Sequence, residues 1–245
     1  MPGLYRDEGV VLRTIRLGEA DRIVTILTLG HGKVRAVAKG IRRTTSRFGA
    51  RLEPTSRVAL QCYRGRDLDT VTQVETLEVH RSLREDYTLL TRAVPMLEAV
   101  DQVAPDREPD PALYRMLTGA LRTLADRANP LVTPAFFWKL LVLEGVHPVL
   151  EGCARCGAES DPADPDTDLV AFDLDEGGAC CRTCARGGGR PLSPGALALL
   201  RRILGGDLNR VLAEDPGEAA HEVEHLGIRA LEHHGERRLR STALL

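Results

Sequence analysis

Two Cys-x-x-Cys pairs are the most specific chemical pattern in this 245-residue sequence. Cys153 and Cys156 form the first pair, and Cys181 and Cys184 form the second, with 24 residues between the pairs. Two such turns supply four thiolates for a tetrahedral Zn²⁺ ion, each about 2.3 Å from the metal. Four sulfur ligands leave no open coordination position, so the pattern predicts one structural zinc ion rather than a redox or free-thiol pair. One alternative stays open, because a shift of the second turn by one residue would let Cys180 replace Cys181.

A run of cations between Lys33 and Arg66 is the second pattern. It contains ten Lys/Arg and one acid, Glu53, for a charge of +9, whereas the whole chain carries −2 and the remainder therefore −11. A positive field beside an aromatic ring suits a polyanion whose bases can stack. The alternative is a solvated loop without a partner, in which Phe48 packs on the fold. The predicted nucleic-acid-binding residues are Lys33, Arg35, Lys39, Arg42, Arg43, Arg47, Phe48 and Arg51, with Tyr63 as a second stacking candidate.

The sequence lacks the common enzyme signatures. Gly30-His31-Gly32-Lys33 does not have the spacing of a phosphate-binding loop, with Leu27 before it and Val34 after it. Gly-x-Ser-x-Gly, His-Glu-x-x-His and the dinucleotide-binding fingerprint are also absent. The sequence therefore predicts a binding protein rather than an enzyme.

The elements that must carry these residues change character near residue 80. Alternating apolar residues and turn signals predict five short strands, at residues 9–17, 22–29, 33–39, 58–64 and 70–79. Five short strands with one long basic loop favour a Greek-key barrel of the oligonucleotide-binding (OB) type. A five-stranded sandwich or an SH3-like barrel would give much the same pattern.

After His80 the apolar residues follow the helical period of 3.6. Residues 135–143 are apolar on nearly every side, as expected of a central helix, except for Lys139 at the edge of the core. The fold class is thus α+β, with a barrel followed by a helical domain that contains a four-cysteine zinc element. The predicted divisions are 1–80 for the barrel, 81–150 and 191–245 for the helical domain, and 151–190 for the zinc element.

The composition indicates in which cellular compartment the protein is expected. The chain is 43% hydrophobic and 28% charged, which is typical of soluble globular proteins. No apolar run is long enough to span a bilayer, and the first residues lack the order of a signal peptide. We therefore expect a cytoplasmic protein without a membrane partner, whose cysteines are reduced.

Several segments, in this order, resemble the bacterial DNA repair protein RecO family. They are Val10-Val11-Leu12, Gly18-Glu19-Ala20-Asp21-Arg22, Gly32-Lys33, Ala38-Lys39-Gly40-Ile41-Arg42-Arg43, Ser46-Arg47, Trp138-Lys139-Leu140-Leu141, Gly145-x-x-Pro148 and Cys153-x-x-Cys156-Gly157. The resemblance implies an N-terminal OB-fold, a helical domain and a zinc element. It also implies binding of single- and double-stranded DNA near the nucleoid, annealing of complementary strands, and action with RecR to load RecA onto strands coated by single-stranded DNA-binding protein. The helical half is expected to bind the acidic tail of that coating protein, with Lys139 as a candidate contact.

Annealing by such a protein is physical rather than covalent. Cations neutralise phosphates and release counterions, which lowers the repulsion between two strands. A zinc-containing OB-fold factor that binds RNA or takes part in translation is the alternative, and a nuclease is a third hypothesis. A comparison of DNA and RNA of one sequence separates the first two, and a metal-dependent cleavage assay tests the third.

Overall fold

The computed structural model describes residues 3–43, 46 and 48–245. It divides the chain into two compact units. The first unit comprises Met1–Ala128 and Leu239–Leu245, and the second comprises Asn129–Arg238. Within the described residues, no helix combines the length and the apolar composition that a membrane span requires.

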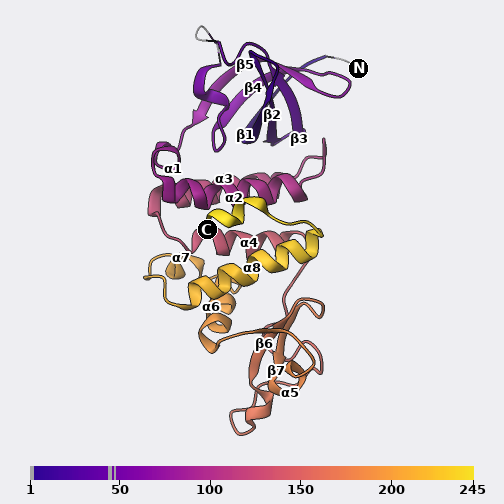
Figure 1. Cartoon of the computed structure of the whole chain (residues 1–245), viewed down its shortest axis with the longest axis vertical. Helices are drawn as coiled ribbons and strands as arrows, with labels where there is room; N and C mark the ends of the chain where they lie inside the picture. Colours follow the sequence, from indigo (N-terminus) through magenta and orange to yellow (C-terminus); the bar gives the residue numbers. More distant parts are fainter. Residues whose placement is uncertain (1–2, 44–45, 47) are drawn as a thin grey trace. The chain divides into compact units, whose positions relative to one another are not determined.

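Five strands form a closed barrel in the first unit (Figure 1). They pair in the order β1-β2-β3-β5-β4. The closed order confirms the predicted OB-type barrel over an open five-stranded sandwich. The strands are β1 (Leu4–Leu17), β2 (Asp21–Thr28), β3 (Gly32–Ala38), β4 (Arg57–Tyr63) and β5 (Asp69–Glu78).

The long first strand closes the barrel by pairing twice. Its first half runs antiparallel to β4, from Leu4 opposite Tyr63 to Val10 opposite Arg57. From Gly9 to Leu17 it also pairs with β2, and a bulge between Val11 and Arg13 bends the strand within this stretch. Alternate residues of the strands point inward, and together with three residues of the connection between β3 and β4 they form one apolar core. That core contains Val11, Val24, Ile26, Val34, Ala36, Ala38, Ile41, Phe48, Leu52, Val58, Leu60, Cys62 and Val71.

Three helices follow the barrel in the same unit: α1 (Arg81–Glu85), α2 (Tyr87–Val103) and α3 (Pro111–Arg127). The side chain of Asp86 accepts hydrogen bonds from the first turn of α2, and Asp110 does the same for α3. The chain end returns as the 3-10 helix Arg240–Leu244, and Glu98 of α2 accepts hydrogen bonds from its first backbone N–H groups.

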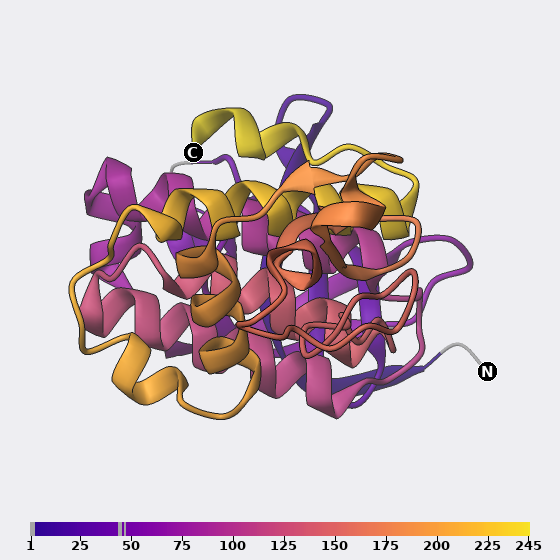
Figure 2. The same cartoon turned by 90° about the horizontal axis from the view of Figure 1, so that it is seen from below.

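The second unit is built around the predicted apolar helix, α4 (Val132–Leu143), whose residues are nearly all buried. It packs with α8 (Ala219–Gly235) and α6 (Pro194–Leu204), and α7 (Leu208–Val211) packs with α6 (Figure 2). Trp138 of α4 donates its indole N–H to the carbonyl of Val223, at 3.0 Å. Gly227 permits this approach, because a Cβ there would lie 3.0 Å from the same indole nitrogen.

The cysteine pairs belong to a small sheet inserted between α4 and α6. Its strands are β6 (Leu169–Asp173), β7 (Gly178–Cys181) and β8 (Arg190–Pro191), in the order β7-β6-β8. The 3-10 helix Pro165–Thr167 precedes β6, and the single turn α5 (Arg182–Ala185) follows β7. The sequence prediction of an embedded cysteine element between two helical segments agrees with this arrangement.

Candidate nucleic-acid interface and metal centre

The basic run starts on β3, as the alternation in the sequence predicts. Val34, Ala36 and Ala38 point into the barrel, whereas Arg35 is exposed on the outside. Because β3 pairs with β2 on one side and with β5 on the other, its backbone is fixed and Arg35 has a defined position.

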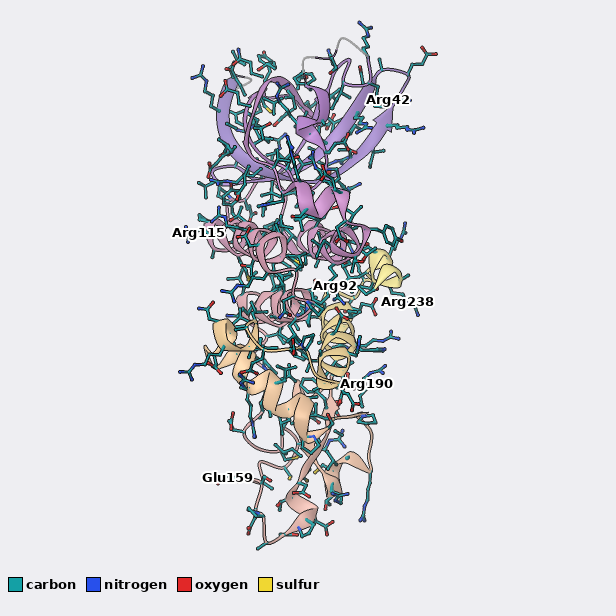
Figure 3. The ribbon with its side chains drawn as sticks, turned by 90° about the vertical axis from the view of Figure 1, so that its left-hand side faces the viewer. Arg42, Arg92, Arg115, Glu159, Arg190 and Arg238 are labelled. Carbon is teal, nitrogen blue, oxygen red and sulfur yellow. The ribbon has the colours of Figure 1, made fainter. Side chains whose placement is uncertain are left out.

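The turn after β3 is held against the turn between β1 and β2. The N–H of Gly40 donates to the carboxylate of Asp21 at 2.7 Å, and the N–H of Arg42 donates to the carbonyl of Ala20 at 3.0 Å. The Arg42 guanidinium in turn donates to the Glu19 carbonyl at 2.9 Å. Arg42 consequently lies at the outer surface of the barrel (Figure 3).

These contacts define a surface that we call the basic strip: Arg35, Lys39, Arg42 and Arg43. All four side chains are exposed, and none forms an ion pair with a carboxylate in the part of the chain that the structure describes. Arg51 is also exposed, and its guanidinium contacts the Phe48 carbonyl at 3.4 Å. Arg47 falls outside the described residues, so its predicted role stays a prediction.

The prediction that Phe48 is an exposed stacking residue is wrong. Its side chain is only 4% exposed and belongs to the barrel core, next to the 3-10 helix Gly49–Leu52 that also buries Leu52. Burial of a phenylalanine ring stabilises a fold by about 1.5–3 kcal/mol, which an exposed ring in a polar loop would forgo. Phe48 therefore packs on the fold, as in the alternative given above, whereas DNA binding by the cations of this segment stays a prediction.

Lys33 also differs from its prediction as an open phosphate contact. Its side chain is 13% exposed, and its ammonium group donates to the carbonyl of Asp101 at 2.7 Å. The same group lies 3.5 Å from the carboxylate of Asp106. The cause is the connection between α2 and α3, which runs along the start of β3. There the N–H of Arg107 donates to the Lys33 carbonyl, at 3.0 Å.

Sequence reasoning missed the ion pair that holds this connection to the barrel. Asp69, fully buried at the start of β5, accepts hydrogen bonds from Arg107 at 2.8 Å and from the Tyr5 hydroxyl at 2.5 Å. Burial favours a higher pKa for Asp69, but the hydrogen bonds from Arg107, Tyr5 and the Gly65 N–H outweigh it and lower the pKa below its usual value. No sequence signal marks Arg107, because its partner is distant in the chain.

The four predicted cysteines come together in the second unit. The Sγ atoms of Cys153, Cys156, Cys181 and Cys184 all lie within 4.8 Å of one another, and those of Cys156 and Cys181 are 3.9 Å apart. Ligands about 2.3 Å from a tetrahedral zinc ion are about 3.8 Å from each other. The donor set therefore fits a metal ion of the predicted kind.

Local backbone geometry explains how the two Cys-x-x-Cys turns, called knuckles below, form. Gly157 adopts a positive φ of 74°, and its N–H donates to the carbonyl of Cys153 at 2.8 Å, which closes the first turn. The N–H of Cys181 points at the Sγ of Cys153, at 3.4 Å. Burial favours a higher pKa for the Cys153 thiol, yet donation from the N–H groups of Cys181, Cys156 and Arg155 lowers that pKa to about 6.

The structure favours Cys181 over Cys180 as the fourth ligand. Both are on β7, but only the Sγ of Cys181 lies within 4.8 Å of all three other thiols of the cluster. Cys180 is fully buried and is not part of the four-sulfur group, although its thiol neighbours that of Cys153; burial is the main cause that raises its pKa to about 11.

Two family models match nearly the whole chain. The model described as "Recombination protein O N terminal" covers residues 1–80, and "Recombination protein O C terminal" covers residues 84–243. The chain belongs to the RecO family. The boundary between the two models coincides with the point where the barrel gives way to α1.

Curated RecO proteins agree with this assignment. A DNA repair protein RecO from a Nocardioides species is 44% identical over 246 residues, which cover 98% of both chains. One from Frankia casuarinae is 42% identical over 99% of this chain and 98% of its own. A third, from Thermobifida fusca, is 47% identical over 83% of both. The protein is thus a RecO-family DNA repair protein.

Proposed function

We propose that the protein binds single- and double-stranded DNA through the basic strip and anneals complementary strands. The observation that carries this proposal is the arrangement of Arg35, Lys39, Arg42 and Arg43. These cations are exposed, have no carboxylate partner among the described residues, and lie on a strand and a turn with fixed backbone. Cations held in this way neutralise phosphates without first breaking an internal ion pair.

Phosphate contacts carry no base information, so binding by the strip does not depend on sequence. Such binding suits an annealing protein, which must accept any pair of complementary strands. Neutralisation of both strands also lowers the repulsion between them as they approach.

The test is charge reversal at two positions of the strip, Arg42→Glu with Arg43→Glu. Affinity for DNA should fall alike for all sequences. The plot of log K against log salt should become less steep, by about 0.9 for each duplex phosphate that the variant no longer neutralises. Arg115→Glu, at an exposed position of α3, is the control to compare with Arg43→Glu alone, because both variants change the net charge equally. Unchanged affinity and slope in a folded double variant would contradict the proposal.

The cysteine cluster, on the same proposal, holds one structural zinc ion. When bound, zinc supplies cross-links between the two knuckles and, with four sulfur ligands, has no position left for a substrate. Arg155 supports the same element, since it contacts the Cys184 carbonyl at 3.1 Å and forms an ion pair with Asp173.

For partners, we propose that the second unit binds the acidic tail of single-stranded DNA-binding protein. A pocket of about 460 Å³ lies between α4, α6 and the segment that follows α4. Its lining combines the apolar side chains of Val142 and Leu204 with Lys139, His147 and the ion pair between Arg201 and Glu151, at 3.5 Å. Lys139, which has no carboxylate partner among the described residues, lies beside apolar side chains, and this combination suits a peptide with acidic residues and an apolar tip. Cooperation with RecR and the loading of RecA, at the nucleoid in the cytoplasm, complete the proposed role.

A peptide titration tests this docking site. Lys139 makes no ion pair among the described residues, so Lys139→Glu should weaken tail binding at low salt and leave the fold intact. Arg190→Glu, an exposed change in the same unit that lies outside the pocket, should bind the peptide like the unmodified protein. Equal losses of peptide affinity in both variants would show that the peptide responds to the net charge of the protein and not to a specific site.

A further inference from the structure

The outer face of β1, β4 and β5 carries an exposed aromatic residue in a row of outward-facing side chains. Tyr63 of β4 lies opposite Leu4 of β1 and opposite Thr70 of β5. Tyr63 is 46% exposed and Leu4 is 61% exposed, although neighbouring Cys62 is fully buried in the core. Because β4 is paired on both sides at this point, the backbone of Tyr63 is fixed and its ring stays on the outer face of the barrel, where a planar group can stack on it.

A shallow polar groove of about 220 Å³ lies on the same face. Arg6, Gln61 and Gln73 line it together with two acidic residues, Asp7 and Glu75. The first three are cross-strand neighbours in the next outward row, and the Arg6 guanidinium donates to the Gln61 side-chain oxygen at 3.3 Å. Two rows on one face of a sheet are about 7 Å apart. A base stacked on Tyr63 would therefore present its edge toward the two amides, which both donate and accept hydrogen bonds.

Cations border the Tyr63 ring as well. Arg64 and Arg66, in the turn directly after β4, are exposed, and neither forms an ion pair with a carboxylate that the structure describes. On the other side, Thr70 pairs with Tyr63 and also with Val37 of β3, which connects this face to the basic strip. We call Leu4, Tyr63, Gln61, Gln73, Arg64 and Arg66 the Tyr63 face.

We propose that the Tyr63 face binds the bases of single-stranded DNA, with Tyr63 as the stacking residue. The inference rests on the proposed DNA binding by the basic strip and adds a contact that distinguishes single strands from duplex. Bases in a duplex are stacked on each other and cannot lie on a side chain, whereas bases of a single strand can. The amides and arginines around the ring favour nucleic acid over a protein partner, whose anchor residues need a dry apolar surrounding.

The test compares Tyr63→Ala with Tyr63→Phe on a labelled oligo-dT strand and on a duplex of the same length. Tyr63→Ala should weaken single-strand binding roughly 5- to 150-fold and leave duplex binding nearly unchanged. Tyr63→Phe keeps the ring and should bind like the unmodified protein. The salt dependence of Tyr63→Ala should keep its slope, because the stacking that it removes involves no charge.

A matched control is Tyr87→Ala, because Tyr87 is 73% exposed at the start of α2 and outside the Tyr63 face. A melting curve shows whether each variant is folded. If folded Tyr63→Ala binds oligo-dT like the Tyr87→Ala control, the inference is overturned. That result leaves the proposed function standing, provided that charge reversal at Arg42 and Arg43 still weakens binding. If the unmodified protein binds neither strand nor duplex, the proposed function itself fails.

Discussion

Cys180 and Cys181 are neighbours in the chain, but only the Cys181 thiol belongs to the group of four that could hold a metal ion. Metal analysis of the purified protein should give about one zinc ion per chain. Cys180→Ser should retain that zinc, because its side chain lies outside the cluster, whereas Cys181→Ser should lose most of it. Zinc binding at such a site also stabilises the fold, so the second variant should melt earlier. Full zinc occupancy in Cys181→Ser would contradict the assigned ligand set.

His80 gives a second prediction at the residue scale. It is buried at the start of α1, and burial lowers its pKa below the usual value, although the nearby Glu78 carboxylate acts in the opposite direction. The unfolded chain therefore takes up a proton at about pH 6.5, before the folded protein does. The free energy of unfolding should decrease as the pH falls from about 6.5 to 5, and rise again on return.

His80→Gln should reduce this pH dependence, because the variant has no imidazole to protonate at that position. Denaturant titrations at several pH values measure the effect, and His221→Gln, an exposed change in the second unit, controls for the loss of one imidazole. If His80→Gln and the unmodified protein show the same slope between pH 5 and 6.5, His80 makes no such contribution.

At the scale of elements, the connection between α2 and α3 is attached to the barrel by Arg107 and Asp69. Removal of the guanidinium in Arg107→Ala leaves a buried carboxylate with two remaining donors, Tyr5 and the Gly65 N–H. We expect a loss of about 2–3 kcal/mol, below the 3–5 kcal/mol of a fully buried pair because Arg107 is partly exposed. Urea titration measures the loss.

Arg122→Ala is the matched control, since it breaks the more exposed ion pair with Glu78 and should cost much less. The pH dependence follows from the lowered pKa of Asp69. The ionised form is favoured in the folded state, so this contribution is present above about pH 4 and is lost as the pH falls through the folded pKa. Equal losses of unfolding free energy in Arg107→Ala and Arg122→Ala would show that the pair between Arg107 and Asp69 contributes no more stability than the exposed pair.

Local patterns predicted more of this fold than distant contacts did. The alternation around Arg35 and the apolar run around Phe137 are set by residues close in sequence, and both became the predicted strand and helix. The knuckle turns are local as well, which is why the Cys153 pair was informative. Phe48 was mispredicted because its loop returns to the barrel, and that return depends on packing against distant strands. Lys33 was mispredicted for the same reason, since Asp101 lies far along the chain.

For the molecule as a whole, the absence of a phosphate-binding loop leads us to propose that the protein hydrolyses no nucleotide. Purified protein should show no ATP turnover above background, with or without DNA. Turnover that co-purifies with the chain and disappears in the Arg42→Glu, Arg43→Glu variant would contradict this proposal. A trace contaminant would instead keep its activity in that variant.

The two proposed binding activities, for DNA and for the tail peptide, belong to different units of the chain. The basic strip and the Tyr63 face belong to the first unit, and the pocket beside Lys139 belongs to the second. Lys139→Glu should therefore leave binding of bare DNA unchanged while it weakens binding of the tail peptide. The same preparation measured with labelled DNA and with labelled peptide tests this separation. A parallel loss of both activities would indicate a damaged fold or a shared site.

The most direct test of the central claim is annealing itself. Two complementary labelled strands are mixed without nucleotide, and duplex formation is followed over time. The proteins compared are the unmodified protein, the double variant Arg42→Glu/Arg43→Glu, the single variant Arg43→Glu and its charge-matched control Arg115→Glu. The basic strip predicts that the unmodified protein and the Arg115→Glu control accelerate annealing, and that the double variant does so far less, with the difference shrinking at high salt. If the folded double variant anneals the strands as fast as the unmodified protein at low salt, the basic strip is not the DNA-annealing surface.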